Sequence, residues 1–118
     1  MSQRGRQEPG EPYRRISVEE AKEMLDQGNA VAVDVRQPDE WRAGHVEGAL
    51  FIPVDDILTR VNELPEDKDL LFICERGVRS GLACEMAIAM GLASERVYNI
   101  EEGTPTWIAK DLPTAHGD

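Results

Sequence analysis

The chain has 118 residues and a formal net charge of −10, with 41% hydrophobic and 31% charged residues, which is typical of one small globular domain. The acidity argues against nucleic-acid or anionic-membrane partners, because both require a basic face. No N-terminal apolar run resembles a signal peptide and no stretch approaches a membrane span, so we expect a cytoplasmic protein.

Helical and strand patterns alternate between two polar tails, which we predict over residues 1–13 (disordered) and 114–118. Ser17 begins the first helix with a capping box, and Thr104 and Pro105 begin the last. Apolar strands are predicted around residue 16 and over residues 31–35, 50–52, 70–73 and 97–100. This alternation predicts an α/β fold in one domain, residues 14–113, with an open parallel sheet of about five strands and helices on both faces.

The most informative stretch is residues 70–80. Four apolar residues run up to Cys74, and a loop with one glycine and two arginines then leads into a helical pattern from Ser80. Cys74 is therefore predicted at the carboxyl end of a buried strand and before a helix, where open parallel sheets bind ligands. Free amides and the helix dipole favour negative charge there, and the thiolate is the nucleophilic form of cysteine. We interpret Cys74 as a reactive residue, because a core cysteine does not need a polar, cationic loop after it.

Residues 74–80 resemble the active-site loop of rhodanese-like sulfurtransferase domains: cysteine, two variable residues, glycine, one variable residue, then often arginine-serine. Other family markers follow in the same order and spacing between Ile16 and about Leu112. They are Asp34-Val35-Arg36, Glu40-Trp41, Gly44 to Ala49, Ile52-Pro53, and Gly103 with Trp107. The chain departs from the family at Glu102, where the first of two glycines usually precedes the final helix.

The resemblance implies a sulfurtransferase in which Cys74 attacks thiosulfate or a persulfide donor and carries the sulfur as a persulfide. A thiol or cyanide then accepts the sulfur, a protein donor or acceptor is a further partner class, and no cofactor is required. The implied substrate-binding residues are those of the loop, Glu75, Arg76, Gly77, Val78, Arg79 and Ser80. Their backbone amides cradle the terminal sulfur, while the two arginines attract the anionic donor.

Three polar residues outside the loop are interpreted as supporting residues: Asp34, Arg36 and His45. We expect Asp34 to accept backbone N–H bonds and Arg36 to pair with a nearby acid such as Glu40. His45 stands in a glycine-flanked turn and is expected to hydrogen-bond the backbone. The second cysteine, Cys84, falls on an apolar helical pattern and is assigned to the core. The histidines and cysteines lack ligand spacing, so no metal site is expected.

Two alternative functions stay open. A non-enzymatic sulfur carrier or sensor acting with a protein partner would need the same Cys74 and loop, and turnover with a soluble donor and acceptor would separate the two. A cysteine phosphatase or arsenate reductase is the weaker alternative. Phosphatases place arginine six positions after the cysteine to ring a phosphate, whereas Ser80 occupies that position here and Arg79 comes one position earlier.

Overall fold

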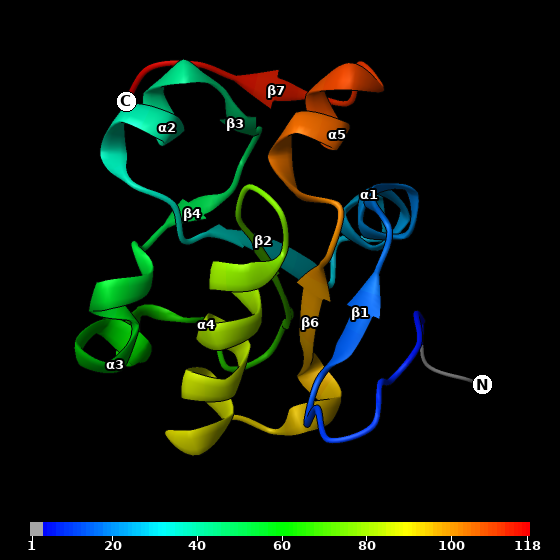
Figure 1. Cartoon of the computed structure of the whole chain (residues 1–118), viewed down its shortest axis with the longest axis vertical. Coiled ribbons are helices and arrows are strands. Elements are labelled where there is room, and N and C mark those ends of the chain that lie inside the picture. The colour runs from blue at the N-terminus through cyan, green and yellow to red at the C-terminus, as the bar shows by residue number, and fades with distance from the viewer. Residues whose placement is uncertain (1–3) are drawn as a thin grey trace.

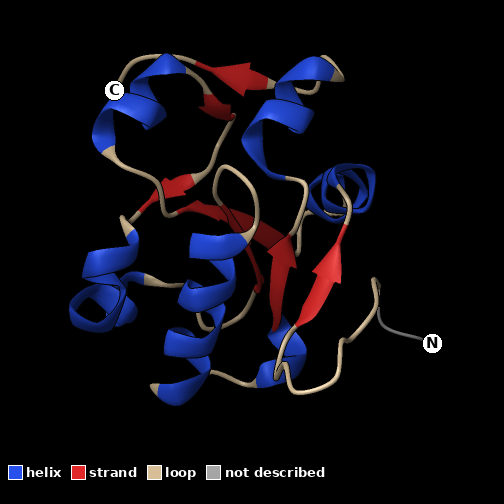
Figure 2. Ribbon diagram, viewed as in Figure 1, coloured by secondary structure: helices blue, strands red, loops and turns tan. Residues whose placement is uncertain are grey.

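In the computed structural model, which describes residues 4–118, five parallel strands form one sheet with helices on both faces (Figures 1 and 2). The strands are β1 (Arg14–Ile16), β2 (Ala30–Asp34), β4 (Leu50–Phe51), β5 (Asp69–Ile73) and β6 (Val97–Ile100). Their order is β1-β6-β5-β2-β4, so β5 lies at the centre. The predicted α/β fold with a parallel sheet is confirmed.

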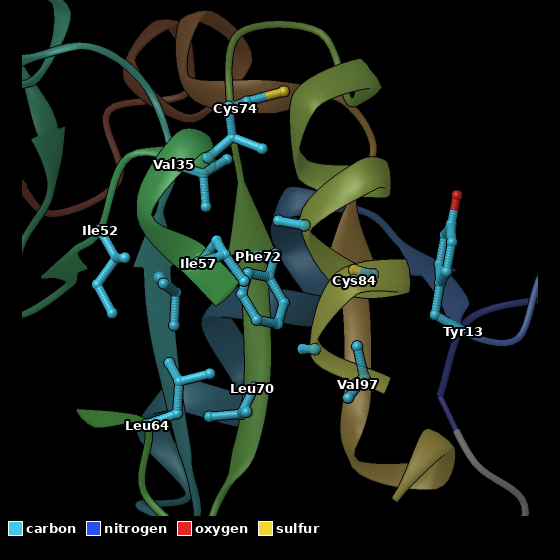
Figure 3. Close-up of a cluster of buried hydrophobic side chains, with 14 residues drawn as sticks. Tyr13, Val35, Ile52, Ile57, Leu64, Leu70, Phe72, Cys74, Cys84 and Val97 are labelled. Atoms are coloured by element: carbon cyan, nitrogen blue, oxygen red, sulfur yellow. The ribbon is translucent and has the colours of Figure 1, made fainter. Parts of the chain in front are cut away.

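Five α-helices accompany the sheet within residues 4–118: α1 (Val18–Asp26), α2 (Pro38–Ala43), α3 (Ile57–Arg60), α4 (Val78–Ala89) and α5 (Gly103–Ala109). Side chains of β5 alternate between two hydrophobic clusters, as the two-residue period of a strand requires. Phe72 packs with α3 and α4 on one face (Figure 3), and Leu71 packs with α1 and α5 on the other. None of the helices in the described part of the chain has the length and apolar character needed to cross a bilayer.

The carboxyl ends of the parallel strands meet at one edge of the sheet, and the remaining elements gather above it (Figure 1). These are α2 and a small antiparallel pair formed by β3 (His45–Val46) and β7 (Thr114–Ala115). The predicted C-terminal tail, residues 114–118, therefore contributes a short strand. Cys74 directly follows β5 at this edge, so the candidate nucleophile lies at the same end of the sheet as these elements.

The N-terminal segment differs from the predicted disordered tail. Arg6 and Arg15 form an antiparallel bridge, with N–O distances of 3.0 and 2.8 Å, and Arg6 also pairs with Glu101. Tyr13 is buried in the cluster beside α4. The free backbone groups of edge strand β1 and the apolar ring of tyrosine account for this packing. The first three residues of the predicted tail lie outside the described residues.

Two helices begin at other residues than the sequence predicts. The capping box at Ser17 is present, but α4 begins at Val78 instead of Ser80, and α5 begins at Gly103, before Thr104.

Glu102, which stands where the family usually has a glycine, has a structural role in this chain. The Glu102 carboxylate accepts a hydrogen bond of 2.7 Å from the backbone N–H of Val18. It therefore stabilises the N-terminus of α1, where negative charge is favoured.

Replacement of Gly103 by alanine is expected to destabilise the domain more than replacement of Gly28. Both glycines have positive φ, +80° and +86°, so alanine costs each about 1 kcal/mol of backbone strain. Only at Gly103 would the new Cβ meet backbone, 2.0 Å from the Glu75 carbonyl oxygen, whereas nothing lies within 4 Å at Gly28. Urea denaturation should show a loss at least about 2 kcal/mol larger for Gly103→Ala. Equal losses would contradict this close approach.

Candidate active site

The Cys74 thiol lies inside the loop that joins β5 to α4. The residue is 1% exposed, and its sulfur is directed toward the start of α4 (Figure 3). The backbone N–H of Gly77 donates to Sγ at 3.1 Å, and Ser80 Oγ lies 3.2 Å from Sγ. A backbone donor and the N-terminus of a 12-residue helix together stabilise negative charge on this sulfur.

Glycines allow the β6–α5 connection to pack directly on this loop. Gly77 has φ +88°, and a Cβ there would lie 2.8 Å from the Glu101 carbonyl oxygen. Gly103 makes the corresponding close approach to the Glu75 carbonyl oxygen. The Cys74 carbonyl oxygen accepts hydrogen bonds from the backbone N–H and the hydroxyl of Thr104, at 2.9 and 3.2 Å. The loop is therefore held on both sides of Cys74.

Asn99 joins this site although the sequence analysis did not single it out. Its amide oxygen accepts a hydrogen bond of 2.6 Å from the Ser80 hydroxyl, and its Nδ2 donates to the Gly77 carbonyl oxygen at 3.0 Å. The side chain belongs to β6 and is buried. The available signal was a polar residue in an otherwise apolar predicted strand, residues 97–100.

The two loop arginines have different surroundings. Arg79 forms a bidentate ion pair with Glu40 of α2, at 2.7 and 2.9 Å. The Arg79 guanidinium lowers the pKa of the Glu40 carboxyl to about 2. Arg76 is exposed and makes no ion pair with any residue in the 4–118 range. Arg79 therefore anchors the loop to α2, and Arg76 is the loop cation that stays free.

The expected pairing of Arg36 with Glu40 is wrong. Arg36 binds Asp34, with Nε–Oδ1 and Nη2–Oδ2 distances of 3.0 and 2.8 Å, because both side chains are buried at the end of β2. Burial is the largest single influence on the pKa of the Arg36 guanidinium and lowers it, but the hydrogen bonds to Asp34 and the charges of Asp34, Glu75 and Glu40 together make the net shift upward. Arg36 also donates to the Gly44 carbonyl oxygen at 2.7 Å and lies 3.4 Å from the Glu75 carboxylate. It therefore joins the loop to the turn after α2.

His45 and Cys84 lie in packed surroundings. The His45 ring stacks on Trp41 with centroids 3.4 Å apart, and its Nδ1 donates to the Trp41 carbonyl oxygen at 2.7 Å. Cys84 faces the sheet from α4 (Figure 3), and burial raises the pKa of its thiol well above the ordinary value. The two cysteines therefore differ sharply in environment, since the Cys74 sulfur accepts a backbone N–H whereas the Cys84 sulfur donates to the Tyr98 carbonyl oxygen.

A cavity of about 460 Å³ borders the loop on the side of α2 and α5. Its charged lining consists of Arg36, Glu40 and Glu75, and the Glu75 side chain is 41% exposed. The lining therefore carries one more negative than positive charge. Apolar residues complete the wall, including Pro105 and Ile108. A second cavity of about 450 Å³ lies between the loop and the N-terminal segment, where Arg76 contributes to the lining.

Comparison with known proteins gives one consistent family. The model of the rhodanese-like domain matches residues 17–110. A sulfurtransferase of Allochromatium vinosum is 33% identical over 90 residues, which cover 76% of this chain and 82% of that protein. The putative sulfur carrier protein YrkF of Bacillus subtilis is 31% identical over 96 residues, covering 80% of this chain and 51% of that protein. The crystal structure of a rhodanese-related protein from Thermoplasma volcanium superimposes with a TM-score of 0.77 at 28% identity, over 87% of this chain and 98% of that one.

Several of the curated relatives are longer than the part that matches this chain. The chain spans between 50% and 63% of the length of three that it matches.

The ion pair between Glu40 and Arg79 is expected to stabilise the fold at neutral pH and to weaken in acid. The folded-state pKa of Glu40 is about 2, below its ordinary 4.5, so its contribution is present above pH 4.5 and is lost as the pH falls toward 2. Glu40→Gln should lower the free energy of unfolding by about 1 kcal/mol at pH 7 and by less at pH 3, measured by urea denaturation.

The matched control is Glu63→Gln, which breaks a more exposed pair with Arg60 and should have a smaller effect at pH 7. A Glu40→Gln loss that does not change between the two pH values would show that the carboxylate charge is not responsible.

Proposed function

The chain belongs to the rhodanese-like domain family, and from that premise we propose that it is a sulfurtransferase that moves sulfane sulfur through a persulfide on Cys74. The observation that carries the proposal is the position of the Cys74 sulfur, which accepts the Gly77 N–H at 3.1 Å inside a loop that opens a helix. The donated N–H and the helix N-terminus stabilise negative charge on the sulfur, and the thiolate is the form of cysteine that attacks sulfur. The name of the Allochromatium vinosum relative supports the same reaction class.

The first step loads sulfur onto the protein. The Cys74 thiolate attacks the outer sulfur of thiosulfate or of a persulfide, and a new S–S bond forms on Cys74. The S–S bond of the donor breaks, and its electron pair leaves with sulfite or with a thiolate. The Gly77 N–H and the N-terminus of α4 stabilise the negative charge during this displacement.

The second step unloads the sulfur. A thiolate or cyanide attacks the terminal sulfur of the persulfide, and the bond between that sulfur and Cys74 breaks. The products are an acceptor persulfide or thiocyanate, and Cys74 is released as a thiolate. The two displacements balance without an added oxidant or reductant. The N–H group that stabilises Cys74 as a nucleophile also stabilises it as a leaving group.

The sequence predicts that both loop arginines attract the anionic donor, but their surroundings assign them different roles. Arg79 is neutralised by Glu40 at 2.7 Å and positions the loop against α2. Arg76 is the exposed cation next to the nucleophile in the loop, and we assign to it the attraction of an anionic donor.

A sulfur carrier is the second candidate, because a Bacillus subtilis relative is named as a putative sulfur carrier and this chain spans half of its length. A carrier would load Cys74 in the same way but would pass the sulfur only to a protein partner.

Sulfur loading should depend on Cys74 and not on Cys84. After incubation with thiosulfate or glutathione persulfide, the intact mass should increase by one sulfur atom, and a reductant should reverse the gain. Cys74→Ser should abolish the gain, while Cys84→Ser should leave it nearly unchanged, since the Cys84 thiol is buried and its pKa is raised. Equal loss in both variants would overturn the assignment of the nucleophile. Thermal unfolding of both variants checks that they are folded.

Thiosulfate is expected to be a weaker donor than a singly charged persulfide, and Glu75→Gln should improve it. Glu75 adds negative charge to the cavity beside the loop, and two unit charges about 8 Å apart interact by about 2 kcal/mol at an effective dielectric of 20. Pairing with Arg36 at 3.4 Å offsets part of this repulsion. The KM for thiosulfate should therefore fall about two- to fivefold at low ionic strength, with less change at high salt.

Glu66→Gln provides the matched control. It removes the same charge from a residue before the amino-terminal end of β5, whereas Glu75 follows the carboxyl end. If Glu75→Gln leaves the KM for thiosulfate unchanged at low salt, Glu75 does not influence the donor.

A further inference from the structure

We propose that Asn99 is a positioning residue that controls the protonation of Cys74 by holding the hydroxyl proton of Ser80 away from the sulfur. The inference deepens the proposed function, which requires a thiolate at Cys74. The hydrogen bonds of Asn99 and Ser80 act on the Cys74 sulfur whether or not the protein transfers sulfur.

The orientation of the Asn99 amide is fixed by its partner in the loop. The Gly77 carbonyl oxygen can only accept, so the amide atom 3.0 Å from it is the donor Nδ2. The amide oxygen therefore faces Ser80 Oγ at 2.6 Å. The reversed amide would place two oxygen acceptors 3.0 Å apart. Since the amide oxygen can only accept, the single hydroxyl proton of Ser80 is donated to Asn99.

This assignment determines what Ser80 can offer to the sulfur 3.2 Å away. With its proton committed to Asn99, Ser80 Oγ can accept a hydrogen bond from the Cys74 S–H but cannot donate one. The Ser80–Asn99 pair therefore offers the thiolate no hydroxyl donor, although the Gly77 N–H still donates to the sulfur. When the proton leaves Cys74, Ser80 either keeps an oxygen lone pair toward the thiolate or rotates its proton to the sulfur. Rotation leaves the Asn99 oxygen without a partner at a residue that is 2% exposed, which costs free energy.

The packing around Asn99 restricts its side chain. Gly81 of α4 lies against it, and a Cβ at Gly81 would be 3.4 Å from Asn99 Nδ2 and 2.9 Å from the Tyr13 hydroxyl. The backbone of Asn99 is held between β1 and β5, where it is paired with Arg15 and Phe72. Because the amide is confined on these sides, the Ser80 hydroxyl is the group in this network that can reorient.

Charged and titratable groups also surround Cys74, and they are the same in the wild-type protein and in variants at Asn99 and Ser80. Burial, more than any other cause, raises the pKa of Tyr13 to about 12. The Tyr13 side chain is therefore neutral over the pH range in which a thiol is titrated. The others are Glu75, Arg76 and Arg79 on the loop and helix start, Glu40 of α2, Asp34 and Arg36 after β2, Glu101 after β6, and Cys84 on α4. Variants at Asn99 and Ser80 leave all of these charges in place.

The test measures the rate of Cys74 alkylation by iodoacetamide against pH, in a Cys84→Ser background. Asn99→Leu keeps a similar side-chain size but removes both the acceptor for Ser80 and the donor to the Gly77 carbonyl oxygen, which still accepts the Gly81 N–H at 3.1 Å. Ser80 then becomes free to donate to the thiolate. We expect the midpoint of the profile to move to lower pH, with alkylation below the midpoint about three- to tenfold faster. Ser80→Ala should not raise the midpoint, because Ser80 does not donate to the sulfur while Asn99 is present.

Combining Asn99→Leu with Ser80→Ala should abolish the shift caused by Asn99→Leu alone, since the effect passes through the serine hydroxyl. Thr106→Val, which removes a hydroxyl bonded to the Glu102 carbonyl oxygen on α5, should leave the midpoint unchanged. An unchanged or higher midpoint in Asn99→Leu, or a shift that persists in the double variant, would overturn the proposal.

If Asn99→Leu does not fold, Ser80→Ala alone decides, because a clear rise of its midpoint would show that Ser80 donates to the thiolate in the presence of Asn99. Alkylation needs no sulfur donor, so failure of sulfur loading in the same proteins would count against the proposed function and not against the role of Asn99.

Discussion

The close contact between the Cys74 loop and the β6–α5 connection is the constraint on which the rest of the site depends. Gly77 and Gly103 allow backbone to meet backbone where any side chain would collide. Thr104 then holds the Cys74 carbonyl oxygen, and the Gly77 N–H stays directed at the sulfur at 3.1 Å. Negative charge on the sulfur is thus stabilised by fixed backbone dipoles, which need no reorganisation during a reaction.

Ion pairs around the loop serve mainly to hold it in place. Arg79 pairs with Glu40, and Arg36 pairs with Asp34 and approaches Glu75. In a chain with a net charge of −10, these internal pairs leave little positive charge for a dianionic substrate. The proposed reaction therefore relies on the Gly77 N–H and the helix N-terminus to stabilise the sulfur, and Arg76 is the loop side chain that can add to this.

Local sequence patterns were sufficient for the sheet and for the position of Cys74 after a buried strand. The apolar run before Cys74 and the glycine after it fix a strand, a turn and a helix within a few residues of one another, so spacing alone placed the thiol at a strand end. The pairing of Arg79 with Glu40 joins residues 39 positions apart, and the bond from Ser80 to Asn99 crosses from α4 to β6. Such contacts depend on how elements pack, and the sequence offers several carboxylates within reach of each arginine. The packing of Arg6 and Tyr13 was missed for the same reason, since their partners lie on β1, after β6 and on α4.

The central claim is that sulfur passes through a covalent persulfide on Cys74, and steady-state kinetics with two substrates tests it most directly. Initial rates of thiocyanate formation would be measured while thiosulfate is varied at several fixed cyanide concentrations. A persulfide intermediate releases sulfite before cyanide reacts, so the double-reciprocal plots should be parallel lines. Lines that intersect would mean that donor and acceptor must be bound together, and would contradict transfer through Cys74 in two separate steps.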